Sequence, residues 1–193
     1  NNRFNGVVKQ PVYIGSNTSD IYKNFLIDGN IFKGTYADYQ GAINIGDGFN
    51  VKNITITNNF GELGENIYFA YFRGYTENAQ INNNTVENAN CVAYFRKPST
   101  DNGGINKNIA VSNNNGSVYW YIARLDECTS IYDGIVVVGN IFEYLAEQTA
   151  MYRYSVYMQN KVYSKYPVIR NNRVVCVTGA SIYDGYIKRD VTS

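Results

Sequence analysis

Apolar and polar residues alternate in short runs along almost the whole chain, and the runs close on Asn or Gly. The run at 54–60, Ile-Thr-Ile-Thr-Asn-Asn-Phe, places isoleucine on alternate positions before an Asn pair. This alternation, bounded by turn-forming residues, predicts short β-strands, whereas the period of an amphipathic helix is weak throughout. Related runs occur at 27–32, 81–86, 111–114, 137–142 and 169–174.

The Asn that closes each run returns at a regular interval. It falls at positions 2, 30, 59, 84, 114, 140 and 172, so successive copies lie 28, 29, 25, 30, 26 and 32 residues apart. A period of about 28 residues is typical of solenoids and suits one coil of three short strands with turns. We therefore predict an all-β fold, a right-handed single-stranded parallel β-helix of about six to seven coils, in which residues 1–193 form one domain.

The repeated Asn is expected to hold the coils together rather than to act on a ligand. Asn tolerates the left-handed backbone of a tight corner, and its amide can bond to the coils above and below. A β-sandwich would also show short strands at regular spacing, but it would not predict the same Asn corner in every repeat. The residues interpreted in this way are Asn30, Asn59, Asn84, Asn114, Asn140 and Asn172.

Composition argues against several classes of function. The 17 basic and 16 acidic residues leave a net charge of +1, which gives no electrostatic reason to expect nucleic acid as a partner. No apolar run approaches the roughly 20 residues of a membrane-spanning helix, so membrane insertion is not expected. The chain does not begin with Met, shows no signal peptide and starts within a repeat, from which we expect a fragment of a longer protein.

Three further features of the composition bear on chemistry. The lack of histidine excludes histidine metal ligands and general bases within the chain, and we expect neither a metal nor a cofactor. Cys91, Cys128 and Cys176 are interpreted as free buried thiols of a protein that folds in a reducing compartment. The 19 tyrosines indicate either a Tyr-rich interaction surface or a groove in which sugars stack.

Three segments, 71–73, 94–96 and 122–124, end on Arg and are aligned on that residue. Alternation along these strands directs one set of side chains inward and the set between them outward. The inward set is Ala70, Phe72, Ala93, Phe95, Tyr121 and Ala123. The outward columns are Phe69, Val92 and Trp120; Tyr71, Tyr94 and Ile122; and Arg73, Arg96 and Arg124.

Stacked arginines repel one another unless anions or aromatic rings lie beside them, and two interpretations follow. In one, the strands are exposed or face a sister subunit, and the Arg side chains lie flat on Tyr rings. In the other, the face is a groove that binds an acidic polysaccharide. The substrate-binding residues of that groove would be Arg73, Arg96, Arg124, Tyr71, Tyr94 and Trp120.

Asp126 and Glu127 follow the third segment directly and are the candidate catalytic pair. Glycoside hydrolysis needs two carboxyl groups that flank the bond, one as the acid and one as the nucleophile or base. If the two residues lie in a turn, both can face one groove. In a lyase, Arg124 or a tyrosine would instead abstract the proton. Glu62 and Glu65 form a second acidic turn, interpreted as solvated surface.

The repeated corner, clearest at 53–60, resembles the parallel β-helix repeat of the pectin-lyase-like superfamily, which includes pectate lyases, polygalacturonases, alginate epimerases and bacteriophage tailspikes. The resemblance is specific for the fold, because no catalytic His or Asp cluster of those enzymes can be matched. Tailspikes look most similar, being rich in Tyr and Asn with free cysteines. This resemblance implies a homotrimer that binds, and often cleaves, a bacterial surface polysaccharide.

The leading hypothesis is a virion protein, a phage tailspike that acts on capsule or O-antigen polysaccharide as a hydrolase rather than a lyase. The first alternative is a structural or adhesive fibre domain without catalysis. The second alternative is a secreted cellular polysaccharide lyase or glycoside hydrolase.

Overall fold

The regular structure consists of β-strands throughout the part of the chain that the computed structural model describes. That part comprises residues 1–6, 11–15, 21–34, 40–45, 50–96, 105–126, 131–145, 154–159, 163–165, 167–176 and 183–189. Within these ranges no helix is long and apolar enough to cross a membrane.

Most strands are short, as the turn-bounded runs predict, and two are long because they continue around a bend. The strands are β1 (Arg3–Asn5), β2 (Val12–Ile14), β3 (Ile21–Asp28), β4 (Ile31–Lys33), β5 (Gly41–Ile45), β6 (Asn50–Thr57), β7 (Phe60–Glu62), β8 (Tyr68–Phe72), β9 (Thr76–Asn82), β10 (Thr85–Arg96), β11 (Asn106–Ser112), β12 (Asn115–Asp126), β13 (Ile131–Val138), β14 (Ile141–Tyr144), β15 (Tyr154–Gln159), β16 (Tyr163–Lys165), β17 (Val168–Arg170), β18 (Arg173–Cys176) and β19 (Tyr183–Arg189).

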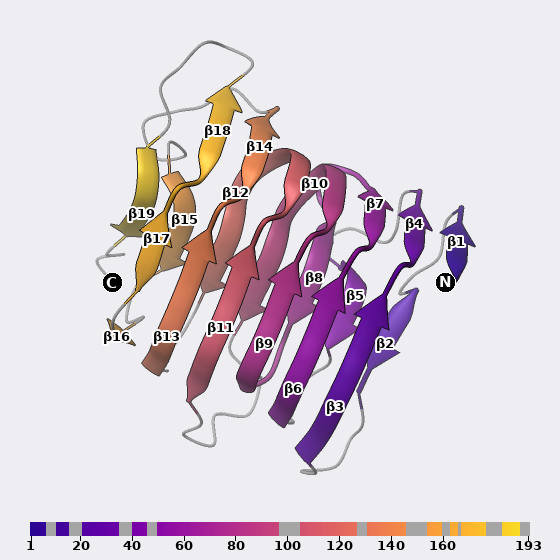
Figure 1. Ribbon diagram of the computed structural model, residues 1–193, viewed down its shortest axis with the longest axis horizontal. Coiled ribbons are helices and arrows are strands. Elements are labelled where there is room, and N and C mark those ends of the chain that lie inside the picture. Colours follow the sequence, from indigo (N-terminus) through magenta and orange to yellow (C-terminus); the bar gives the residue numbers. More distant parts are fainter. Residues whose placement is uncertain are drawn as a thin grey trace.

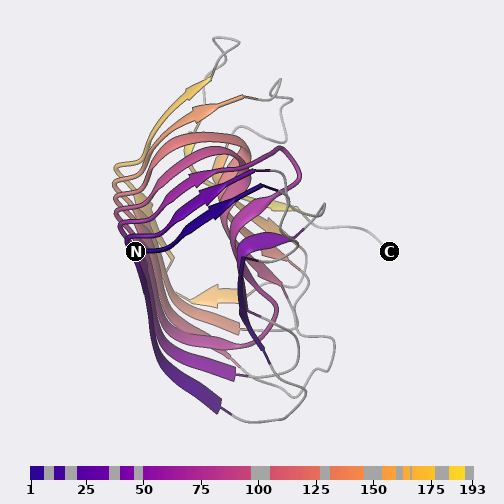
Figure 2. The ribbon, with the colours of Figure 1, turned by 90° about the vertical axis from the view of Figure 1, so that its right-hand side faces the viewer.

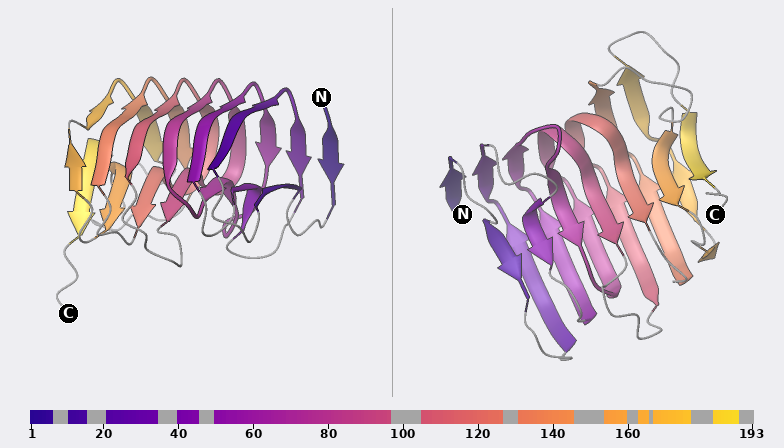
Figure 3. Two further views of the ribbon diagram at one scale, coloured as in Figure 1. Left: turned by 90° about the horizontal axis from the view of Figure 1, so that it is seen from below. Right: turned by 180° about the vertical axis from the view of Figure 1, so that it is seen from behind.

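Each strand pairs in parallel with its counterpart one coil further along, which is the arrangement of a parallel β-helix (Figure 1). A seven-stranded sheet has the order β16-β13-β11-β9-β6-β3, with β17 beside β13. A twelve-stranded sheet follows the path β1-β4-β7-β10-β12-β14-β18 and also contains β2, β5, β8, β15 and β19. Seen along the stack, the coils superimpose around one common interior (Figure 2), and the views from below and from behind show the coils ranged side by side (Figure 3).

The predicted fold class is therefore confirmed. In each coil the chain leaves the seven-stranded sheet, turns a corner and crosses the twelve-stranded sheet before it starts the next coil. Within the described residues, the number of coils is slightly below the six to seven expected.

A buried ladder of Asn side chains joins the coils at the corner between the two sheets. The Oδ1 of Asn84 accepts hydrogen bonds from the backbone N–H and from the Nδ2 of Asn59, both at 3.0 Å. Its Nδ2 donates to the carbonyls of Ile56 and Asn82 and to the Oδ1 of Asn114, at 3.0, 2.9 and 2.9 Å. One side chain thus satisfies polar groups of three coils that would otherwise be buried without partners. The ladder runs through Asn2, Asn30, Asn59, Asn84, Asn114, Asn140 and Asn172.

A second Asn ladder, which the repeat analysis did not predict, follows the outer face of the seven-stranded sheet. The Nδ2 of Asn53, Asn78 and Asn108 donates to the Oδ1 of the Asn one coil earlier, at 2.9, 2.9 and 3.0 Å, and Asn24 is the first acceptor. All four residues have positive φ, between 51° and 66°. They are left out of the strand pairing, as in a β-bulge, so simple alternation does not continue across them.

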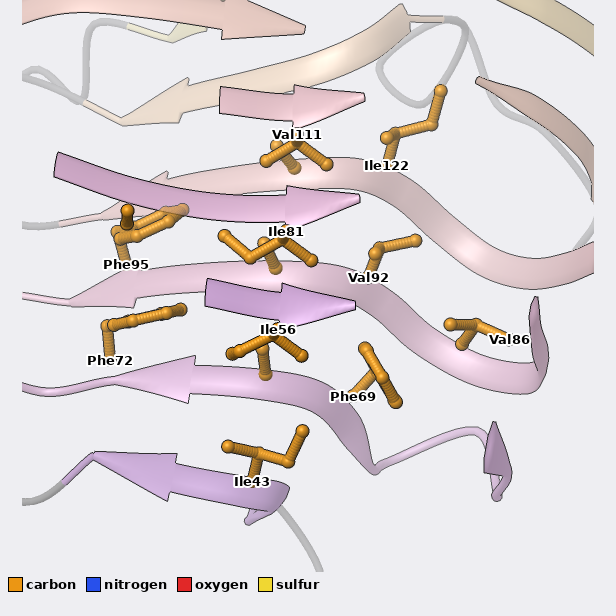
Figure 4. Close-up of a cluster of buried hydrophobic side chains, with 14 of the residues drawn as sticks. Ile43, Ile56, Phe69, Phe72, Ile81, Val86, Val92, Phe95, Val111 and Ile122 are labelled. Carbon is orange, nitrogen blue, oxygen red and sulfur yellow. The ribbon is translucent and has the colours of Figure 1, made fainter. Parts of the chain in front are cut away.

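The main core lies between the sheets and is built from equivalent residues of successive coils (Figure 4). The rings of Phe72 and Phe95 are register neighbours and stack with 4.5 Å between their centroids. Ile56, Ile81 and Val111 form a facing column on the seven-stranded sheet. Five side chains predicted to point inward are confirmed in this core: Ala70, Phe72, Ala93, Phe95 and Ala123.

Two consecutive residues enter the core where the strands of the twelve-stranded sheet bend, and strict alternation is wrong at these places. Phe69, Val92 and Ile122 were predicted to face outward, but each is buried in the main core directly before an inward Ala (Figure 4). Tyr121 was predicted to face inward, but it belongs to a separate buried cluster.

Replacing Asn84 with Ala should destabilise the fold by about 2–4 kcal/mol, because the backbone N–H of Asn59 and two carbonyls lose buried partners. The matched control is Asn83→Gly, because Asn83 is exposed and has a φ of 54°, which Gly also adopts. Urea denaturation should show less than about 0.5 kcal/mol for the control. Equal losses in the two variants would contradict a structural role for the ladder.

Candidate functional site

The strand register places Arg124 beside Tyr94 rather than beside Arg96. Tyr94 pairs with Tyr71 of the preceding coil and with Arg124 of the next coil. Arg96 is instead level with Asp126. The expected column of three arginines is therefore wrong, and Arg124 continues the tyrosine column.

The alignment failed because it was based on the arginines, which are on the outer surface of the strand. The pairs Val92-Ala93 and Ile122-Ala123 both enter the core, and Ala93 pairs with Ala123. The residues that follow these two alanines, Tyr94 and Arg124, are therefore also paired. An alignment on the inward apolar-Ala pair would have found the register from sequence.

Aromatic rings and guanidinium groups form one row along the stack of coils, which we call the arginine–tyrosine row. The rings of Tyr71 and Tyr94 stack with 4.9 Å between centroids and an angle of 8°. The guanidinium of Arg124 lies 4.8 Å from the centroid of Tyr94 and 5.7 Å from that of Tyr157, so it sits between two rings. Arg73 lies 5.8 Å from the centroid of Tyr71. Guanidinium groups over tyrosine rings, one part of the first interpretation, are therefore present in the structure.

The tyrosines of this row belong to a second apolar cluster, apart from the main core. Tyr71 is 3% exposed and Tyr94 is 6% exposed, and Trp120 packs against the cluster while remaining half-buried. The buried members of the cluster are Tyr68, Tyr71, Cys91, Tyr94 and Tyr121. Within a single chain, Trp120 is therefore more accessible to a sugar than the two stacked tyrosines, whose predicted stacking role stays a prediction.

Arg96 is the exposed charge at the end of β10. Its Nη1 donates to the hydroxyl of Tyr71 at 3.4 Å, which ties the side chain to the arginine–tyrosine row. Because Phe95 pairs with Phe72, the following residues, Arg96 and Arg73, lie on adjacent coils. Two guanidinium-bearing positions therefore meet beside the row, where they can contact an anionic ligand.

The candidate catalytic pair stays a prediction. Asp126 is the last residue of β12 and lies level with Arg96, but its side chain and the whole of Glu127 are outside the described residues. The register brings a different pair of carboxylates together, since Glu62 of the second acidic turn pairs with Glu87. Glu62 is bound to Lys33, with 2.7 Å between Oε2 and Nζ, so it forms an ordinary surface ion pair.

Charged residues form a column on the outer face of the seven-stranded sheet. The Nζ of Lys52 lies 2.5 Å from the Oε2 of Glu77. This hydrogen bond, together with the charges of Lys52 and Lys107, lowers the pKa of Glu77 below its ordinary value of 4.5. In register the column contains Lys23, Lys52, Glu77, Lys107, Asp133 and Lys165.

The chain matches no family model, no curated protein and no solved structure. The class of protein is therefore defined by geometry: the chain is a parallel β-helix, consistent with a β-helix superfamily. Among the described residues, no group of three or more His, Cys, Asp or Glu side chains is placed to hold a metal ion.

Replacing Arg124 with Met should destabilise the protein by about 1–2 kcal/mol. The substitution removes the cation–π contacts with Tyr94 and Tyr157, while the methionine side chain largely keeps the apolar volume. Arg173→Met is the control, since Arg173 is exposed in β18. Thermal unfolding of the two variants checks the difference. Indistinguishable curves would show that the contacts of Arg124 with the rings add no stability.

The Lys52→Gln substitution should raise the pKa of Glu77 toward 4.5, because it removes the main group that favours the carboxylate. Since the folded pKa is lowered, the stabilising contribution of Glu77 is present above about pH 4.5 and is lost as the pH falls through the lowered pKa. An NMR titration of the Glu77 carboxyl carbon measures the shift. Lys165→Gln, at the far end of the column, should leave that titration unchanged.

Proposed function

We propose that this chain is the polysaccharide-binding β-helix of a tailspike-like virion protein, which binds and cleaves an acidic bacterial capsule or O-antigen. The observation that carries the proposal is the arginine–tyrosine row, in which guanidinium groups and rings follow one another along the axis of the stack. Parallel coils repeat about every 4.8 Å, so a linear polymer laid beside the row would pass one coil at each such step, with Arg73 and Arg96 on adjacent coils. A repeating surface of this kind suits a repeating ligand.

The accessible groups beside the row would make the first contacts with the polymer. Arg96 is exposed and Arg73 is adjacent, so the two can pair with the carboxylate or another acidic substituent of a sugar. Trp120 offers an apolar surface for the ring of a sugar, because it is half-buried against the tyrosine cluster. In this scheme the packed residues of the row support the accessible groups and contact the polymer only where it reaches them. These residues are Tyr71, Tyr94 and Arg124.

Cleavage would take place near the end of β12. Asp126, which is level with Arg96, and Glu127 would serve as the acid and as the nucleophile or base of a glycoside hydrolase. In the lyase alternative, the deprotonated side chain of Arg124 or of a tyrosine would abstract the proton next to a uronate carboxylate. The glycosidic C–O bond would then break, the leaving oxygen would take up a proton, and a double bond would form in the sugar without addition of water. The two routes give different products, so they are separable by assay.

A non-catalytic fibre domain is the second candidate, and it shares the proposed homotrimer. In that candidate the Tyr-rich face would pack against sister chains. Tyr71 and Tyr94 are already buried within one chain, so the tyrosine cluster does not need a partner to cover it. This observation removes one reason for sister chains to cover the face, and it leaves Arg96 and Trp120 as accessible groups for a ligand.

We expect Arg96→Ala to weaken binding of an acidic capsule polysaccharide about tenfold, because one charge-assisted contact is lost. Arg3→Ala, an exposed arginine in β1, is the control. Calorimetry measures the affinity, and sedimentation shows whether the oligomer is kept. Loss of the oligomer with unchanged affinity per chain would favour the fibre domain instead.

The same polysaccharides, from a panel of capsules and O-antigens, also test cleavage. New reducing ends without ultraviolet absorbance of unsaturated uronates would indicate a hydrolase, and Asp126→Asn should then abolish the reaction. Reducing ends together with that absorbance would indicate a lyase. Neither signal from any glycan that binds would reject the catalytic part of the proposal.

A further inference from the structure

The aromatic side chain of Tyr13 lies on β2, at the N-terminal end of the stack of coils (Figure 1). Of the aromatic side chains that the structure describes, only this one is exposed, with 55% of its surface open to solvent. Val12 and Ile14 on either side of it pack against the main core, so alternation along β2 directs the ring of Tyr13 outward. The ring is therefore open to a ligand on the outer side of the twelve-stranded sheet.

The strand register makes Tyr13 a member of the column that the arginine–tyrosine row follows. Tyr13 pairs with Asn44, and Asn44 pairs with Tyr71 on the next coil. Asn44 is fully buried and Tyr71 is 3% exposed, so this part of the column is covered. The column returns to the surface at Tyr13, two coils or about 10 Å along the stack from Tyr71. A polymer that lies beside the row can therefore reach Tyr13.

Gly15 determines how the ring of Tyr13 lies. A Cβ atom added at Gly15 would overlap the phenol end of the Tyr13 ring. The ring thus extends along the strand, over the backbone of Gly15, rather than away from the surface. The backbone of Gly15 is not in the left-handed region, so the glycine is needed here for space and not for its φ angle. A ring that lies along the surface offers a broad apolar contact to the C–H groups of a sugar.

The surroundings of Tyr13 differ in charge from the surface around Arg73 and Arg96. The two described strands at this end of the column, Val12–Ile14 of β2 and Gly41–Ile45 of β5, contain no charged residue. Arg96 lies one coil beyond Arg73, so it is three coils, or about 14 Å along the stack, from Tyr13. A carboxylate at Tyr13 would lose water without gaining a counter-charge, whereas an uncharged sugar would not. The surroundings therefore favour a neutral sugar.

We propose that Tyr13 is the stacking residue of a neutral-sugar subsite at the N-terminal end of the arginine–tyrosine row. The substrate class that follows is a heteropolysaccharide, in which a neutral sugar lies about 10 to 14 Å from an acidic sugar held by Arg73 and Arg96. This inference rests on the proposed function, since it places both sugars on one polymer beside the row. A polymer of uronates alone would not fit both ends of the surface.

NMR titration of the full chain tests the subsite with the methyl glycosides of glucose, galactose, mannose and rhamnose, and with D-glucuronate as the acidic probe. We expect saturable shifts of the Tyr13 ring signals with at least one neutral glycoside and none with D-glucuronate. Tyr13→Ala should abolish the accompanying shift of the Gly15 amide, and Gly15→Ala should weaken binding about fivefold, because the added Cβ displaces the ring. Leu26→Ala is the control, since Leu26 is 69% exposed on the other sheet.

An acidic polysaccharide that the chain binds separates this inference from the proposed function. Tyr13→Ala should weaken its binding about fivefold, whereas Tyr13→Phe, which keeps the ring, should weaken it less than about twofold. Unchanged affinity in Tyr13→Ala beside a loss in Arg96→Ala would overturn the subsite and leave the proposed function standing. Equal shifts of the Tyr13 ring with D-glucuronate, or none with any neutral glycoside, would also overturn the subsite. Shifts at Tyr13 without binding of any acidic polysaccharide would reject the proposed function and the heteropolysaccharide, and would keep Tyr13 as a contact for neutral sugars.

Discussion

The amide of a single Asn, repeated once per coil, is the interaction on which the rest of the structure depends. Each of these side chains accepts from the coil before it and donates to the coil after it, so no coil is satisfied alone. The corner at which they stack also sets where the chain leaves one sheet and enters the other. The strands directly after the corner follow its register, whereas segments of variable length separate the corner from the columns further along the coil. The fold is thus held by contacts between neighbours, as in other repeat proteins.

The fold was predictable because its main constraint requires one residue type, Asn, at each corner. Few other side chains can satisfy the buried polar groups there, and the regular spacing of Asn along the sequence revealed the length of the coil. The second ladder escaped prediction because Asn24, Asn53, Asn78 and Asn108 are exposed, and a run of polar residues on a surface carries little information. The alternating pattern failed at Phe69, Val92 and Ile122 because a bend in the strand directs two consecutive side chains inward. A strict alternation of inward and outward residues cannot predict where such a bend occurs.

The site was predictable in part. The prediction that rings and cations gather on the outer side of β8, β10 and β12 was made because such residues are unusual on a nearly neutral chain, and Arg73, Arg124 and the tyrosines do lie together there. The predicted columns were wrong because the three segments were aligned on their arginines. In the structure Arg124 is not level with Arg96 but lies between the rings of Tyr94 and Tyr157. That arrangement removes the repulsion that a column of three arginines would create. The place of Tyr13 in the same column was not foreseen, because the segment 13–15 ends on Gly where the segments 71–73 and 94–96 end on Arg.

The spacing of the buried Asn ladder has a consequence for how such a chain can change. Successive Asn residues are separated by as few as 25 and as many as 32 positions, yet the same hydrogen bonds form at each step. The coil therefore tolerates insertions and deletions in its connecting segments without disturbing its neighbours. New side chains can be introduced on the surface one coil at a time, when a segment between two Asn corners is lengthened or exchanged. A lineage built on this scaffold can diversify what it recognises while its folding problem stays the same.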